Sequence, residues 1–121
     1  MFRILGVAAM AALLSACAAS SAMTGEYTKG SGKTLAMGKQ VWSGFESYAS
    51  KVSVANPGGF AVAVRNGEAV AYAYSYCPEG HCIGGSSTVW AMDHCRQYGA
   101  GDCVLFASSS EILVNYRVED Q

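Results

Sequence analysis

The stretch that decides the fold is Phe60-Ala61-Val62-Ala63-Val64-Arg65, then Asn66-Gly67, then Glu68-Ala69-Val70-Ala71-Tyr72-Ala73-Tyr74. Asn-Gly between two alternating apolar runs is the strongest short-range signal for a β-hairpin, because both turn residues readily adopt positive φ. A regular ladder from this turn pairs Arg65 with Glu68 and Phe60 with Ala73, and predicts one wholly apolar face that packs on a helix. That face carries Phe60, Val62, Val64, Ala69, Ala71 and Ala73. The other face carries Ala61, Ala63, Arg65, Glu68, Val70, Tyr72 and Tyr74.

Two segments have the apolar spacing of helices. Residues 40–52 place Val41, Trp42, Phe45, Tyr48, Ala49 and Val52 on one side. Trp42 is expected to pack in the core, with an exposed ligand platform as the alternative. A second helix over 88–98 follows the capping hydroxyls of Ser86, Ser87 and Thr88. Its expected inner stripe is Ala91, Met92, Cys95 and Tyr98.

Residues 103–107 and 112–118 are expected to form two further strands. With the first hairpin and the two helices, the order is helix, strand, strand, helix, strand, strand. This order predicts an α+β domain, a small antiparallel sheet of two hairpins packed with two helices.

The N-terminus has the pattern of an export signal, with Arg3 before an apolar run from Ile4 to Leu14. The run is shorter than the roughly 20 residues of a transmembrane helix. Leu13-Leu14-Ser15-Ala16-Cys17 resembles the bacterial lipobox, and ordinary signal cleavage or an uncleaved anchor are the alternatives. The resemblance implies a lipoprotein signal peptide over 1–16 and lipidation of Cys17. We expect a flexible tether over 17–38 and a single α+β domain over 39–121.

The resemblance also implies a location and a partner class. A lipidated Cys17 anchors the chain to a membrane of the bacterial cell envelope, and Ala18, where an inner-membrane signal has Asp, favours the outer membrane facing the periplasm. The partners expected are the membrane itself and an unknown envelope protein or cell-wall component. Lys and Arg number 8 against 9 Asp and Glu, so no basic excess favours nucleic-acid binding.

The other four cysteines, Cys77, Cys82, Cys95 and Cys103, form an even set, which in an oxidising compartment indicates two disulfides. Three connectivities are possible. We favour Cys77–Cys82, where Pro78 and Gly80 bend the chain back, and Cys95–Cys103, which would tie a helix to the next strand.

The segment 60–107 resembles a small domain of unknown function that recurs in exported bacterial proteins. The residues that carry the resemblance are Ala91, Cys95, Cys103, Leu105, Phe106 and Ala107. It implies an α+β fold with a Cys95–Cys103 bridge and brings no catalytic residues. The loop from Cys77 to Cys82 is not part of that pattern.

The patterns of enzymes and cofactor sites are weak in this chain. Gly30-Ser31-Gly32-Lys33-Thr34 is like the end of a phosphate-binding loop, but Tyr27 stands where its first Gly belongs. His81 and His94 could form a metal site with the cysteines, but the spacing of this set is poor for zinc. Two disulfides would also account for the same cysteines. Asp93, Asp102 and Glu79 form no carboxylate pair in a predicted cleft. The sequence therefore predicts no cofactor and no catalytic residue.

The remaining functional signal is a row of tyrosines. Tyr72 and Tyr74, with Tyr76 after them, share one face of the predicted hairpin, and tyrosine is favoured at binding surfaces. The alternative is that the helix over 40–52 covers them. The favoured function is a lipid-anchored, non-enzymatic binding or accessory module of the cell envelope. The alternative is a small envelope enzyme or metal-handling protein that uses His81 and His94.

Overall fold

The structure is a computed structural model that describes residues 23–53, 56–77 and 86–120. These residues form two α-helices, a short 3-10 helix and a six-stranded sheet. In chain order the elements are η1 (Gly25–Tyr27), β1 (Leu35–Gly38), α2 (Lys39–Ala49), β2 (Gly58–Arg65), β3 (Glu68–Tyr76), α3 (Ser86–Tyr98), β4 (Asp102–Ser108), β5 (Glu111–Ile112) and β6 (Tyr116–Glu119). The predicted α+β class is confirmed, as are both helices and the first hairpin.

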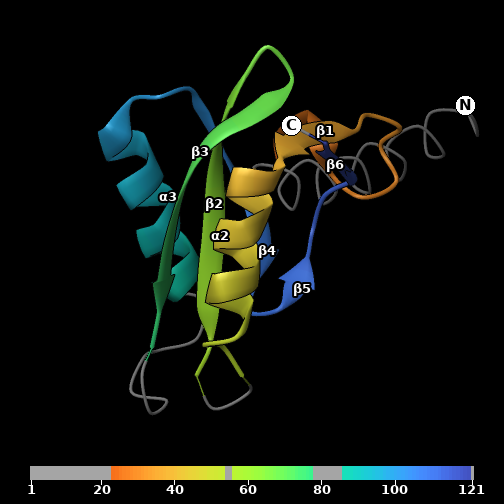
Figure 1. Ribbon diagram of the computed structural model, residues 1–121. Coiled ribbons are helices and arrows are strands. Elements are labelled where there is room, and N and C mark those ends of the chain that lie inside the picture. The colour runs from red at the N-terminus through yellow and green to blue at the C-terminus, as the bar shows by residue number, and fades with distance from the viewer. Residues whose placement is uncertain (1–22, 54–55, 78–85, 121) are drawn as a thin grey trace, which may run out of the picture.

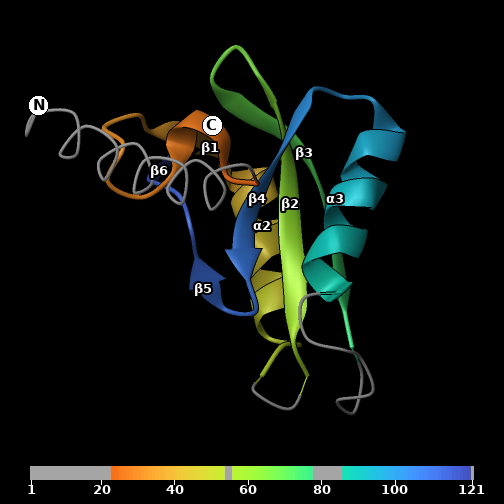
Figure 2. The same cartoon turned by 180° about the vertical axis from the view of Figure 1, so that it is seen from behind.

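The sheet is mixed rather than antiparallel, with the strand order β5-β4-β2-β3-β1-β6. β2 pairs antiparallel with β3 and β4, whereas β1 runs parallel to both β3 and β6. Figure 1 shows the sheet curling so that β5 and β6, its two ends, lie on the side of β2 opposite α3, and Figure 2 shows the same arrangement from behind. The prediction of two hairpins is therefore wrong, because the last strand pairs with β1 and only the two-residue β5 returns along β4.

The predicted flexible tether over 17–38 is wrong for its described part. Leu35 and Met37 of β1 are fully buried, and Tyr27 is nearly so. Asn115 N–H donates to the carbonyl of Tyr27 at 2.9 Å, and Leu105 N–H donates to that of Met23 at 2.7 Å. The domain therefore begins by Met23, and its first strand is held by a parallel partner from the far end of the chain.

The turn of the first hairpin is as predicted, but the register beyond it is not. Asn66 and Gly67 have φ values of 55° and 77°, as a two-residue hairpin turn requires. A β-bulge between Ala63 and Val64 then shifts the ladder, so that Val62 lies opposite Tyr72 and Phe60 opposite Tyr74. Because a one-residue shift moves side chains to the other face, the predicted pairing of large with small residues is wrong.

The two faces of the sheet carry different residues as a result. On one face, Phe60 and Val62 pack with Phe45 and Tyr48 of α2, and Tyr72 and Tyr74 border this cluster. On the other face, small residues of β2 and β3 meet α3, namely Ala61, Ala63, Ala71 and Ala73. α2 therefore packs on the sheet through aromatic side chains, whereas α3 packs on it through small residues that let the helix approach the strands closely.

The inner stripe of α3 is narrower than predicted. Ala91, Met92 and Cys95 are buried, but Tyr98 is 68% exposed. The helix ends at Tyr98, and Gly99 then turns the chain with a φ of 63°. Trp42 of α2 is partly buried and stacks on Tyr116 at 5.3 Å between ring centroids, which fits the predicted core role.

The predicted disulfide between Cys95 and Cys103 is present and joins α3 to β4, with 6.0 Å between the Cα atoms. Cys77 is also disulfide-bonded, and Ser87 Oγ lies 2.9 Å from its sulfur. Cys82 lies outside the described residues, so the pairing Cys77–Cys82 stays a prediction.

Replacing Cys95 and Cys103 together with Ser is expected to lower the free energy of unfolding by about 2–3 kcal/mol, because the crosslink restricts a short loop of the unfolded chain. Urea denaturation of both proteins, oxidised and reduced, measures the loss. When both proteins are reduced, which also opens the bridge of Cys77, their stabilities are expected to be nearly equal. A variant as stable as the oxidised parent would contradict this role of the bridge.

Tyr48 joins the end of α2 to the turn between β4 and β5. Its ring is fully buried, and its hydroxyl donates to the carbonyl of Ser109 at 2.7 Å. Burial raises the pKa of this phenol well above its ordinary value of 10.0. The folded state therefore favours the protonated phenol. This preference adds to the free energy of unfolding in full below pH 10, and the added stability is lost as the pH rises above 10.

Tyr48→Phe is expected to cost about 1 kcal/mol at neutral pH through the lost hydrogen bond. The variant is also expected to lose less stability than the parent between pH 10 and pH 12. Denaturant unfolding at several pH values checks both effects. Parallel curves for the two proteins across this range would show that Tyr48 ionises as freely in the folded state as in the unfolded one.

Candidate binding surface

The two tyrosines predicted as a partner surface lie largely under α2. The Tyr72 ring stacks on Phe60 at 5.2 Å between centroids, and a Cβ added at Gly44 would lie 2.3 Å from it. The Tyr74 ring lies 5.6 Å from that of Tyr48. Both tyrosines are half-buried. This agrees with the alternative expectation that the helix covers them.

Lys51 sits just beyond α2 at the exposed end of this tyrosine row. Its ammonium group donates to the Tyr74 hydroxyl at 3.1 Å and lies 5.3 Å from the centre of that ring. The hydrogen bond to Tyr74 raises the pKa of Lys51. A fully charged ammonium group is therefore held beside β3.

A groove runs between the two helices, with β3 between them. Its main hollow, of about 360 Å³, is lined by Gln40, Val41, Val70, Ala71, Tyr72 and Tyr98. An adjoining hollow of about 280 Å³ shares Gln40, Val41 and Val70 and continues around the start of α2. The bulge at the start of β3 leaves Val70 45% exposed here, so an apolar side chain points into open space beside the strand.

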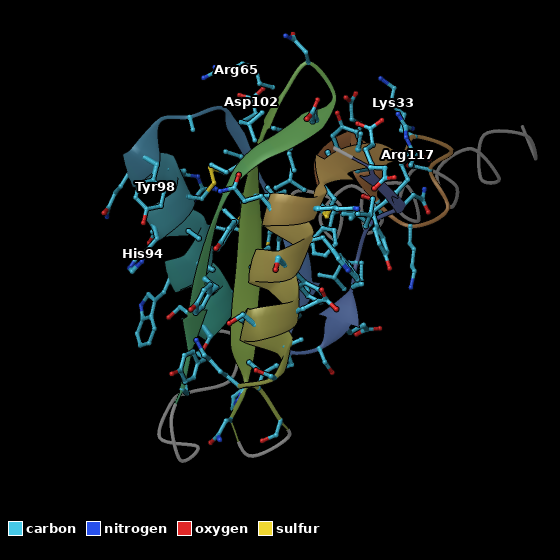
Figure 3. The ribbon with its side chains drawn as sticks, in the orientation of Figure 1. Lys33, Arg65, His94, Tyr98, Asp102 and Arg117 are labelled. Atoms are coloured by element: carbon cyan, nitrogen blue, oxygen red, sulfur yellow. A yellow bond between two sulfur atoms is a disulfide. The ribbon has the colours of Figure 1, made fainter. Side chains whose placement is uncertain are left out.

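Several large apolar side chains of β3 and α3 are exposed, and two of them, Val70 and Tyr98, line this groove. The most exposed of them in β3 and α3 are Val70, Tyr76, Val89, Trp90 and Tyr98. Trp90, His94 and Tyr98 are four residues apart, so they form one exposed stripe along α3. Figure 3 shows His94 on the outer side of α3, and Tyr98, at the end of the helix, also borders the hollow beside β3. The sequence signal for this stripe was the i, i+4, i+8 spacing, which the sequence-based prediction missed because it placed Tyr98 inside.

The residues of the alternative enzymatic or metal-handling function are not brought together in the described part of the chain. His94 is exposed on α3, while Asp102 lies near Arg65 at another end of the molecule (Figure 3). Asp93 pairs with Arg96 at 3.3 Å on the surface. Among residues 23–53, 56–77 and 86–120, no three His, Cys, Asp or Glu side chains form a metal-like group. His81 and Glu79 lie outside these ranges.

The other candidate features also have structural explanations. Lys33, in the segment that is like a phosphate-binding loop, pairs with Glu26 at 3.4 Å, and β1 rather than a helix follows it. A hollow of about 380 Å³ between η1 and β4 has Glu26 and Asp102 on its wall. Within the described ranges no helix has the length and apolar character needed to cross a membrane.

Comparison of the chain with family models, with curated proteins and with solved structures gave no match. We therefore infer the function from the geometry of the groove and from the chemistry of the surface around it.

Proposed function

We propose that the chain is a lipid-anchored protein of the bacterial cell envelope that binds a partner and catalyses no reaction. The proposal rests on two features in different parts of the chain. The lipobox-like sequence ending at Cys17 supports the anchor, and the groove with its aromatic border supports binding. The domain signature around Cys95 and Cys103 resembles exported bacterial proteins and fits the same location.

The early start of the domain limits how far it can stand from the membrane. Residues 18–22 lie between Cys17 and Met23, the first residue that the structure describes and one that already bonds to β4. Even a fully extended chain covers at most about 20 Å over that distance. The domain of a protein lipidated at Cys17 would therefore act close to the bilayer, on partners in or next to the membrane.

The observation that carries the binding role is the exposed apolar surface of α3. Trp90 is 47% and Tyr98 68% exposed, and neither contributes to the core. Exposed aromatic residues that gather at a groove are typical of protein-binding surfaces, where Trp and Tyr supply much of the binding energy.

A photo-crosslinking amino acid placed at Trp90 in living cells is expected to trap a discrete envelope partner. The matched control is the same amino acid at Glu111, an exposed residue of β5 on the side of the molecule opposite α3. Cys17→Ser is expected to move the protein from the membrane fraction to the soluble fraction. The proposal would fail if both positions gave the same crosslinks and the Ser variant stayed in the membrane.

A further inference from the structure

One side of β3 has an open edge. β2 pairs with β3 along its whole length, but on the other side β1 pairs only with Glu68 and Ala69. Among the described residues, no strand lies along that side from Val70 to Tyr76. The reason lies in the chain path, because β1 ends at Gly38 and α2 starts at the next residue.

The register shows which backbone groups face this edge. Cys77 N–H donates to the carbonyl of Pro57 at 2.9 Å, towards β2. In an antiparallel ladder alternate residues bond to the same neighbour, so Ser75 and Ala73 also face β2. The N–H and C=O groups of Tyr72, Tyr74 and Tyr76 therefore point outward, into the space beside the strand.

Apart from the bulge at Val70, the described strand at this edge carries none of the residues that normally protect an open strand. Residues 71–76 read Ala-Tyr-Ala-Tyr-Ser-Tyr, without proline or any charged residue. Natural proteins block exposed edges with Lys, Pro or a covering segment, because free N–H and C=O groups pair with other strands. The described part of this edge, with the groove at its Tyr72 end, is suited to accept one more strand.

We propose that the groove binds an extended peptide segment of a protein partner, which adds to the sheet as a strand beside Tyr72, Tyr74 and Tyr76. Backbone hydrogen bonds hold such a peptide, and pockets select its side chains. The hollow at Val70 and Tyr98 takes an apolar side chain. Lys51, beside Tyr74, pairs with an acidic side chain a few residues further along. This inference deepens the proposed binding role and does not depend on the lipid anchor.

The charge at the edge favours a partner peptide over a second copy of this chain. Two identical edges would pair antiparallel around a two-fold axis, and an axis at Tyr74 brings the two Lys51 ammonium groups together. Like charges placed opposite each other destabilise a strand pair. A peptide with a carboxylate at that position instead gains an ion pair.

The test is selection of a display library of random ten-residue peptides on the immobilised full chain, followed by hydrogen exchange of the complex. Peptides that combine an apolar and an acidic residue are expected to be enriched. Their binding is expected to slow amide exchange at Tyr72, Tyr74 and Tyr76 at least tenfold, because these N–H groups become hydrogen-bonded.

Two pairs of variants separate the edge from the side chains. Tyr76→Pro removes an outward N–H, which an edge strand tolerates, and Tyr76→Ala removes the ring alone. The Pro variant is expected to bind the selected peptides about tenfold more weakly than the Ala variant. Lys51→Glu is expected to change the enriched peptides from acidic to basic, whereas Lys51→Gln only removes the preference.

Three outcomes would overturn this inference. Peptides that bind without slowing exchange at the three tyrosines would place the site elsewhere and leave the binding role intact. Slowed exchange that appears without peptide and grows with protein concentration would identify a second copy as the occupant. Enrichment of no peptide at all would remove the peptide proposal, while crosslinks from Trp90 would still establish a partner.

Discussion

Phe60→Ala is expected to lower the free energy of unfolding by about 3–5 kcal/mol, the range for large aromatic residues deleted from a core. Phe60 is fully buried at the centre of the α2 face of the sheet. Its ring lies 5.4 Å from Phe45 and 5.3 Å from Tyr48, both in α2. It also stacks on Tyr72. Removing it leaves a cavity between the sheet and the helix, where five aromatic rings lose a neighbour.

Urea denaturation measures this loss, with Val70→Ala as the matched control on the neighbouring strand. Val70 is exposed at the bulge, so its truncation is expected to cost well under 1 kcal/mol. Phe60→Leu is expected to fall between the two, because it keeps much of the buried area. A Phe60→Ala protein as stable as Val70→Ala would mean that Phe60 does not face α2.

Gly59→Ala is expected to destabilise the domain by about 1–3 kcal/mol or more through overpacking. Gly59 precedes Phe60 in β2 and faces the opposite helix. An added Cβ would lie 2.6 Å from the Cα of Thr88 and 3.0 Å from the carbonyl oxygen of Ser87. Both atoms belong to the backbone of α3, so the clash requires the whole helix to move.

Gly44→Ala is the informative comparison, because the added Cβ there meets the end of the Tyr72 ring rather than backbone. Alanine also favours a helix over glycine by about 1 kcal/mol, which offsets part of that clash. Gly59→Ala is therefore expected to be clearly less stable than Gly44→Ala. Equal stabilities, measured in urea, would contradict the close approach of α3 to β2.

Elements with a local sequence signal were predicted well. Asn66-Gly67 located the hairpin because its turn needs two residues with positive φ. The spacing of apolar residues located α2 because Val41, Phe45 and Tyr48 are all buried against the sheet. The Cys95–Cys103 bridge followed from an even set of cysteines and a helix next to a strand.

Features that depend on distant contacts or on an irregular strand were not predicted. β1 offers only three apolar residues in a row, and its burial depends on parallel pairing with β6 near the other end of the chain. The bulge has no local signal, because Val70 suits a regular strand as well as a bulge. Since the bulge reverses the faces beyond it, the tyrosines moved from a predicted free surface to the edge of the core.

The candidate site changed with that reversal. The sequence pointed to the side chains of Tyr72 and Tyr74 as the contact surface. In the structure the rings are half-buried under α2, and no strand among the described residues pairs with the outer edge of β3 beside them. Tyr98 of α3 lines the groove at the start of β3, and the cation of Lys51 contacts Tyr74 further along the same strand. A binding surface of this kind combines a strand edge with two helices, and it becomes visible only after the sheet order is known.

The proposed function requires an envelope protein that is anchored through Cys17 and crosslinked through its other cysteines. The most direct test is the intact mass of the protein purified from membranes, alkylated first without reduction and then after reduction. We expect loss of residues 1–16, a lipid-sized mass gain on Cys17, and alkylation only after reduction of Cys77, Cys82, Cys95 and Cys103. A chain that keeps residues 1–16, or whose Cys17 carries no lipid, would contradict it.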